Sequence, residues 1–252
     1  MRRPVIAGNW KLHKTLAETK ELVLALKSDL AELSDIDLII APPFTALNAA
    51  AQALAGSNIA VAAQNCYPAA SGAFTGEVSP PLLRDAGCRY VLVGHSERRQ
   101  LFGESDDFIN TKVRAVLAEG LQPILCIGET LEERESGKMY DVLSRQLKQG
   151  LAGIAASAME QVIVAYEPVW AIGTGVTASE EQAAEAHAFI RGLAQGLYDE
   201  ATAKALRILY GGSVKPDNVD GLMAQEDIDG TLVGGASLKA ADFIRIARFR
   251  RS

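Results

Sequence analysis

Eight short apolar segments recur along the whole 252-residue chain, and this repetition restricts the possible folds more than any other feature. Each segment is rich in Val and Ile and is continuously apolar, without the in-out alternation of a strand that has one wet face. Strands of this kind are typical of a parallel sheet that is covered on both faces. The segments are PVIAGNW, IDLIIA, NIAVAAQ, YVLVGHS, PILCIGE, VIVAYEP, RILYGG and TLVGG.

Helical patterns separate these segments. Leucines repeat at helical spacing from Leu16 to Leu33, and an apolar-periodic segment opens at Ser105 and ends at Gly120. Thr130 and Ser179 each begin a capping-box pattern, which marks the start of a helix. The order strand–helix therefore repeats eight times, with no linker or change of composition to mark a domain boundary.

Right-handed crossovers between such units allow either an open doubly wound sheet or a closed barrel. An open dinucleotide-binding sheet would show GxGxxG after its first strand, whereas the first strand here ends in GNWK. Eight units in about 250 residues fit one closed barrel. We therefore predict a single (β/α)8 TIM barrel that comprises residues 1–252.

Charge and composition exclude several classes of partner. The formal net charge of −6 disfavours nucleic acid, because phosphates require a basic face. No segment approaches the roughly 20 apolar residues of a membrane helix, and the N-terminal apolar stretch is too short for a secretion signal. The three cysteines are far apart and suggest neither disulfides nor a CxxC metal site. We expect a cytoplasmic protein that binds neither nucleic acid nor membranes.

The active sites of such barrels lie at the carboxyl ends of the strands. A cation (Lys11), an imidazole (His95) and a carboxylate (Glu167) follow the first, fourth and sixth strands, so we expect them at one mouth. Taken singly, Lys11, His95 and Glu167 each have a structural explanation. His13 and His187 are in helix-like context, and we interpret both as structural or surface residues. The other strand-end candidates are Asn9, Gln64, Asn65, Ser96, Glu97, Cys126 and Glu129.

Two glycine-rich loops predict a phosphate site. Gly212-Ser213 and Gly234-Gly235 follow the seventh and eighth strands, the loops that phosphate-binding barrels use together with a short helix N-terminus. Glycine allows backbone N–H groups to approach an anion closely. Neither loop continues into the Lys-Ser/Thr of a nucleotide-binding loop. The expected ligand is therefore a small monophosphate.

The stretch YEPVWAIGTG joins Glu167 to an unusually apolar loop. Loops usually run over the surface, and Pro168 restrains the chain next to the carboxylate. We predict that residues 169–172 close over bound substrate as a lid, with hinges at Pro168 and at 174–177. The alternative is a packed loop that buries Trp170 permanently.

Six motifs, in order and at strand ends, resemble the triosephosphate isomerase family over essentially the whole chain. They are GNWK (8–11), VGHSERR (93–99), PILCIGETLEERE (123–135), YEPVWAIGTG (166–175), YGGSV (210–214) and LVGGASL (232–238). The resemblance implies interconversion of dihydroxyacetone phosphate and D-glyceraldehyde 3-phosphate in glycolysis and gluconeogenesis. It implies an enediol or enediolate intermediate and neither a cofactor nor a metal.

The resemblance also implies a role for each site residue. Glu167 would be the base, His95 a neutral electrophile whose pKa the following helix lowers, and Lys11 the electrostatic stabiliser. Asn9 would orient substrate and Glu97 would support Lys11. The residues implied to bind substrate and phosphate are Asn9, Lys11, Gly173, Ser213, Gly234 and Gly235.

The connection from Asn65 to Pro80 is far longer than the roughly 2–6 residues usual after a strand in such units. It carries Tyr67, Phe74 and Val78 between glycines. One interpretation is an Ω-loop that packs on itself. The resemblance implies instead a homodimer, with Thr75 near the active site of the partner.

Two other functions remain open at this stage. A different phosphate-binding barrel enzyme, such as a sugar-phosphate aldolase or an amino-acid-pathway isomerase, is one. An aldolase needs a Schiff-base lysine inside the barrel, and Lys11 is the only lysine that we place at a strand end. The other is a non-catalytic barrel that binds a phosphometabolite without exchanging its hydrogen with solvent.

Overall fold

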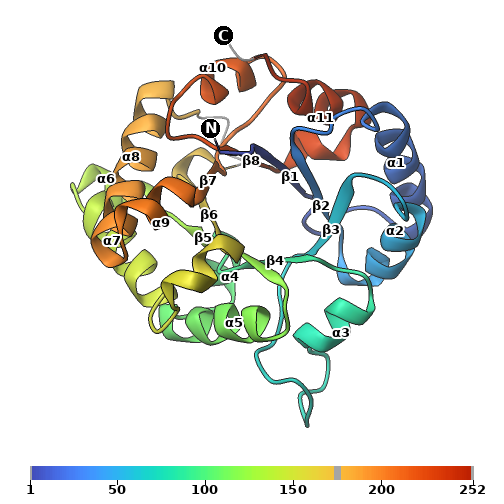
Figure 1. Ribbon diagram of the computed structural model, residues 1–252, viewed down its shortest axis with the longest axis horizontal. Coiled ribbons are helices and arrows are strands. Elements are labelled where there is room, and N and C mark those ends of the chain that lie inside the picture. Colours follow the sequence, from blue (N-terminus) through green and yellow to red (C-terminus); the bar gives the residue numbers. More distant parts are fainter. Residues whose placement is uncertain (1, 173–176, 251–252) are drawn as a thin grey trace.

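The computed structural model describes residues 2–172 and 177–250, and in it eight parallel strands close into a barrel in chain order (Figure 1). β1 pairs with both β2 and β8, which closes the sheet. The predicted (β/α)8 fold is confirmed. The strands are β1 (Val5–Asn9), β2 (Asp37–Ala41), β3 (Ile59–Ala63), β4 (Tyr90–Val93), β5 (Gln122–Ile127), β6 (Ile163–Tyr166), β7 (Arg207–Tyr210) and β8 (Gly230–Val233).

Helices form a ring around this barrel (Figure 1). The α-helices are α1 (Leu16–Asp29), α2 (Leu47–Ala53), α3 (Pro80–Asp85), α4 (Ser96–Leu101), α5 (Asp106–Ala118), α6 (Leu131–Glu135), α7 (Met139–Gly150), α8 (Glu180–Leu197), α9 (Glu200–Ala205), α10 (Val219–Met223) and α11 (Ala240–Ala247). The short 3-10 segments in the described ranges are η1 (Phe44–Ala46), η2 (Ala156–Gln161), η3 (Val169–Ala171) and η4 (Gly235–Leu238).

Local sequence signals account for the helix boundaries. The capping boxes predicted at Thr130 and Ser179 are present and begin α6 and α8. The Ser105 side chain accepts from the Phe108 N–H at the start of α5, and Gly120 follows the end of that helix with a φ of 75°. These predictions are confirmed.

The leucine repeat predicted a first helix that reaches Leu33, but α1 ends at Asp29. Leu30 is fully buried and caps this helix, and Leu33 continues in a turn in which its N–H donates to the Leu30 carbonyl. Apolar periodicity reports which side chains are buried and not where helical hydrogen bonding stops. The predicted boundary was therefore too late.

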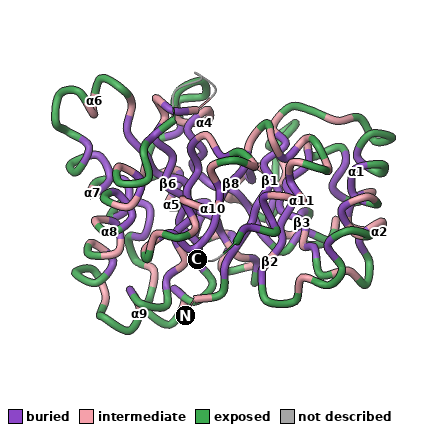
Figure 2. The backbone as a smooth tube through the Cα atoms, turned by 90° about the horizontal axis from the view of Figure 1, so that it is seen from above, coloured by how far each residue is buried: buried purple, intermediate pink, exposed green. Residues whose placement is uncertain are grey.

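Two apolar cores hold the fold together. The larger lies between the strands and the surrounding helices and includes Ile6 and Trp10, and buried residues follow the strands and the inward sides of the helices (Figure 2). The smaller fills the barrel itself and includes Val5, Ala7 and Cys126. Successive strand residues therefore serve opposite faces, which explains why the strands are apolar throughout.

Among the described residues, no helix is long and apolar enough to cross a membrane.

His187 lies in α8 and is fully buried. Burial lowers the pKa of this imidazole to about 3, so the ring is neutral. Its Nδ1 lies 3.2 Å from the Asp227 carbonyl oxygen, which accepts a hydrogen bond from it. The ring also packs edge-on against Tyr166. These contacts account for His187 as a structural residue.

Candidate active site

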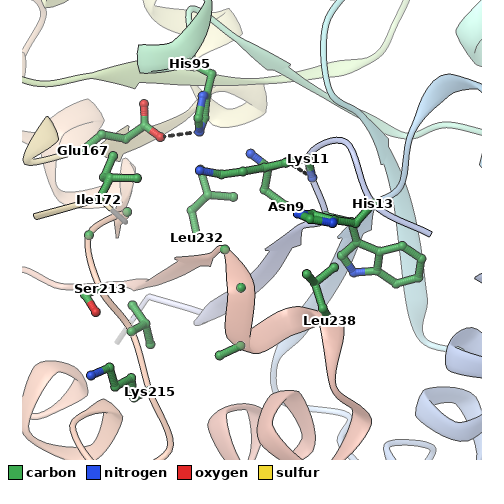
Figure 3. Close-up of a pocket in the computed structure, with 17 residues that line it drawn as sticks. Asn9, Lys11, His13, His95, Glu167, Ile172, Ser213, Lys215, Leu232 and Leu238 are labelled. Atoms are coloured by element: carbon green, nitrogen blue, oxygen red, sulfur yellow. Dashed lines mark hydrogen bonds and ion pairs between the residues drawn. The ribbon is translucent and has the colours of Figure 1, made fainter. Parts of the chain in front are cut away.

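A cavity of about 400 Å³ opens at the carboxyl ends of the strands. Lys11, His95 and Glu167 follow β1, β4 and β6 and all line it, as Figure 3 shows. The structure therefore brings together the three groups that the sequence analysis expected at one mouth. Among the described residues, the lining comprises Asn9, Trp10, Lys11, His13, His95, Glu167, Ile172, Gly211, Gly212, Ser213, Val214, Lys215, Leu232, Gly234, Gly235, Ala236 and Leu238.

Glu167 directly follows β6, and its backbone N–H donates to the Ile127 carbonyl at 2.7 Å. The residue is only 2 % exposed. One carboxylate oxygen, Oε1, lies 2.9 Å from His95 Nε2, and the other, Oε2, accepts from the Ser96 N–H at 2.9 Å. The carboxylate is thus held by two donors at the end of β4, of which Figure 3 shows the contact with His95.

His95 caps the N-terminus of α4, where its Nδ1 accepts from the Glu97 N–H at 3.3 Å. An Nδ1 that accepts a hydrogen bond carries no proton, which assigns the ring proton to Nε2. Nε2 is the atom that faces Glu167. The helix N-terminus therefore selects a tautomer that donates into the cavity.

The expected lowering of the His95 pKa is not the net result in this arrangement. Burial does lower the pKa, but the charge of Glu167 and its hydrogen bond raise it, and the net direction is upward. The sequence indicated the helix but not that a carboxylate rests against the ring. The His95 pKa is therefore governed by where the Glu167 side chain lies.

Lys11 and Glu97 form an ion pair, with 2.7 Å between Nζ and Oε1. Burial of Glu97 opposes ionisation, yet its hydrogen bond with Lys11 and the charges of His95 and Lys11 leave the pKa of the carboxyl below its usual value. The Asn9 side-chain oxygen accepts from the Lys11 N–H at 3.0 Å. Asn9, Lys11 and Glu97 are therefore linked at the mouth.

The expected phosphate residues Ser213, Gly234 and Gly235 line the same cavity. The 3-10 segment η4 begins at Gly235, so a short helix N-terminus does follow the eighth strand as predicted. A Cβ on Gly235 would meet no atom within 4 Å, which leaves its backbone open to the cavity. Gly173 lies outside the described residues, as does most of the expected hinge at 174–177.

Two charged or titratable lining residues were missed. His13 is not in helical context, because it lies in the loop before Thr15, which caps α1. Lys215 lies in the loop after β7, so Lys11 is not the only lysine near a strand end. Its position just beyond the predicted Gly212-Ser213 loop was the available signal. Lys215 is exposed and does not lie inside the barrel.

The apolar loop after Glu167 forms η3 and packs on the rim. Trp170 donates from its indole Nε1 to Glu129 Oε1 at 2.9 Å, and the Arg134 guanidinium lies 5.0 Å from the indole ring centre. Glu129 is fully buried and also accepts from the Tyr166 hydroxyl at 3.0 Å. Glu129, a strand-end candidate, therefore contacts the loop and does not line the cavity.

Comparison with known proteins identifies the family. A family model described as triosephosphate isomerase matches residues 4–250. The chain is 65 % identical over 250 residues to a triosephosphate isomerase of Syntrophotalea carbinolica, covering 99 % of each chain. It is 56 % identical over 250 residues to that of Pelobacter propionicus and to that of Herpetosiphon aurantiacus, covering 99 % of this chain and 100 % of theirs. The chain belongs to the triosephosphate isomerase family.

Proposed function

We propose that the chain is the triose-phosphate isomerase that interconverts dihydroxyacetone phosphate and D-glyceraldehyde 3-phosphate in glycolysis and gluconeogenesis, through an enediol or enediolate and without a cofactor. The observation that carries the proposal is one cavity lined by Lys11, His95 and Glu167 together with the two glycine-rich loops. A carbon-bound proton beside a carbonyl is weakly acidic. A base must take it while donors stabilise the oxyanion that forms.

Glu167 is the base in this proposal. A single carboxylate can serve both carbons if it swings between them, and a glutamate side chain has the necessary reach. In the structure the carboxylate is held by His95 and by the Ser96 N–H. It has to leave these donors and rotate toward substrate before it can take a proton from carbon.

His95 donates a hydrogen bond from Nε2 to the substrate oxygens. Once the Glu167 carboxylate turns toward substrate, its effect in raising the His95 pKa weakens and burial favours the neutral ring. A neutral imidazole matches the weak acidity of an enediol better than an imidazolium does. Lys11 supplies positive charge beside the developing oxyanion and the phosphate, Glu97 supports that ammonium, and Asn9 orients substrate.

Phosphate binding falls to the loops after β7 and β8, with Ser213, Gly234 and Gly235 as its residues and Gly173 as a further donor from the lid. The open backbone at Gly235 and the start of η4 there support this role. An anchored phosphate would fix the carbon skeleton between Glu167 and His95.

A coupled assay on glyceraldehyde 3-phosphate, with mass spectrometry of product formed in D₂O, tests the proposal. We expect turnover and incorporation of solvent deuterium. Tight binding of substrate with neither turnover nor deuterium exchange would instead support a phosphometabolite-binding barrel. A covalent adduct trapped by borohydride with substrate would support an aldolase.

We propose that the loop over residues 169–172 is a lid that excludes water from the intermediate. An enediolate with phosphate on the next carbon tends to expel that phosphate, and water weakens every electrostatic contact in the site. Ile172 already lines the cavity, which supports closure over it, and Pro168 serves as one hinge.

Shortening residues 170–175 should therefore raise the fraction of substrate lost as free phosphate and a dicarbonyl product, measured by phosphate release and by trapping the dicarbonyl. Trp170→Phe is the control, because it keeps an aromatic cover and removes the indole donor to Glu129. A shortened enzyme that makes no more by-product than this control would show that the loop is not a water-excluding lid.

We propose a homodimer formed through the loop from Asn65 to Pro80, with Thr75 near the active site of the partner. The loop extends beyond the ring of helices between β3 and α3 (Figure 1). At the base of the loop, the Tyr67 N–H donates to the Val78 carbonyl at 2.9 Å. The Tyr67 ring packs on the Phe74 ring, with 4.4 Å between the ring centres. Phe74 nevertheless stays 42 % exposed, which supports burial against a partner.

Replacing residues 70–77 by a short Gly-Ser linker should convert a dimer into a monomer in sedimentation and lower kcat, because the partner's loop no longer completes the site. Sedimentation of the unaltered chain as a monomer at micromolar concentration would favour the self-packed Ω-loop.

We also propose that residues 1–252 act as one cytoplasmic domain. This proposal requires a single calorimetric unfolding transition and recovery of the protein in the cytoplasmic fraction.

A further inference from the structure

Lys11 has a backbone conformation that its residue type disfavours. Its φ is 50°, and Lys14 is the one other non-glycine residue with positive φ in the described part of the chain. The left-handed region brings Cβ close to the following carbonyl oxygen, so surrounding contacts must hold a lysine there. The strain lies at the residue that supplies the cation of the site.

Side-chain amides bind both backbone groups of Lys11. The Asn9 side chain accepts from the Lys11 N–H at 3.0 Å. On the other side, Gln64 Nε2 donates to the Lys11 carbonyl at 2.8 Å. The same nitrogen donates to the Ala41 carbonyl at 2.8 Å, and that carbonyl also accepts from the Trp10 N–H at 3.1 Å.

Gln64 therefore ties three strand ends together. It follows β3 directly, its amide reaches the end of β2 at Ala41, and it reaches the loop after β1 at Lys11. Both hydrogens of one NH₂ group are used, one on each carbonyl. Gln64 is half-buried and is not among the described residues that line the cavity. Any effect on substrate must pass through its neighbours.

We propose that Gln64 is a positioning residue, which keeps Lys11 in the left-handed conformation and so aims the ammonium at the substrate. The proposal rests on the proposed function, in which Lys11 stabilises the oxyanion and binds phosphate. A return of Lys11 to negative φ redirects its Cα–Cβ bond. The ammonium then moves away from Glu97 Oε1, which now lies 2.7 Å from it.

Gln64→Met tests this, because it keeps the length of the side chain and removes the donor. We expect kcat/KM to fall about 10- to 100-fold, since a displacement of about 1 Å at a catalytic group can cost that much. We also expect KM to rise and kcat to fall, and inorganic phosphate to bind more weakly by calorimetry. Gln64→Asn withdraws the amide by one carbon and should change the same quantities in the same direction.

Asn58→Leu is the matched control. Asn58 Nδ2 also bridges two carbonyls, those of Leu30 and Leu33, at 2.8 Å each. It lies just before β3, at the opposite end of the strand that Gln64 follows. This variant loses two equivalent hydrogen bonds and should lower the urea midpoint without changing kcat/KM.

A double-mutant cycle with Lys11→Met separates positioning from a merely structural role. If Gln64 acts through Lys11, Gln64→Met should change kcat/KM less than about twofold when Lys11 is already absent. If the losses of kcat/KM in Gln64→Met and Lys11→Met are independent and multiply in the double variant, the proposal is overturned. Unaltered kcat/KM and phosphate affinity in both Gln64 variants would also overturn it. Failure of the unaltered chain to isomerise triose phosphates would instead overturn the proposed function, and phosphate affinity would still test Gln64.

Discussion

Replacing Glu167 by glutamine is expected to lower kcat by at least about 10²–10⁴-fold, the range that a positioned general base typically contributes. Glutamine fills the same space, and its amide oxygen can still accept from the Ser96 N–H, which the carboxylate now does at 2.9 Å. It cannot accept a proton from carbon. We therefore expect KM to change little while turnover is lost in the coupled assay.

Two further measurements make this result specific to the carboxylate. Glu167→Asp keeps the base but withdraws it by about 1 Å, so we expect a loss of about 10²-fold. In Glu167→Gln, the charge that raises the His95 pKa is gone, so the His95 pKa should move down in an NMR titration. Near-normal turnover in Glu167→Gln would falsify the assignment of this residue as the base.

The strand pattern was predictable because each strand is buried on both faces. Continuous apolar runs located all eight strands, and parallel strands bring their carboxyl ends to one edge. That rule alone was enough to place Lys11, His95 and Glu167 in one cavity. Apolar composition carries this information because burial on both faces constrains every residue of a strand.

Side-chain directions and local breaks were not predictable in the same way. Cys126 and Glu129 follow the same strand-end rule, yet Cys126 belongs to the core inside the barrel and Glu129 contacts the lid loop. The upward shift of the His95 pKa depends on one rotamer of Glu167. His13 lies in the loop that lines the cavity, because α1 begins only after Thr15. The first two features depend on contacts between distant segments, which periodicity does not report, whereas the start of α1 is set locally by the capping box of Thr15 and Glu18.

Gly128 illustrates this limit, since the sequence indicates only a glycine at a strand end and not which atoms approach it. A Cβ at this position would lie 1.7 Å from the Glu167 carbonyl oxygen and 2.6 Å from its carbonyl carbon. Those are backbone atoms that cannot rotate away. The close approach aligns β5 with β6, next to the hydrogen bond from the Glu167 N–H to the Ile127 carbonyl.

Gly128 cannot withdraw either, because Gln146 in α7 holds both of its backbone groups. The Gln146 side-chain oxygen accepts from the Gly128 N–H at 2.8 Å, and its amide nitrogen donates to the Gly128 carbonyl at 3.2 Å. Gln146 is itself buried. An added methyl group must therefore displace the backbone that carries the catalytic carboxylate.

Gly128→Ala is accordingly expected to destabilise the fold by about 1–3 kcal/mol or more, as overpacking does, and to lower kcat about 10²-fold for a shift of about 1 Å at Glu167. Urea unfolding and the coupled assay measure the two effects. Gly192→Ala in the exposed face of α8 is the control, because no atom lies within 4 Å of its added Cβ. Alanine there should stabilise the fold by about 0.4–1 kcal/mol and leave kcat unchanged. Loss of stability with full turnover in Gly128→Ala would mean that the β5 end relaxes without moving Glu167, and the link between this glycine and the base would be wrong.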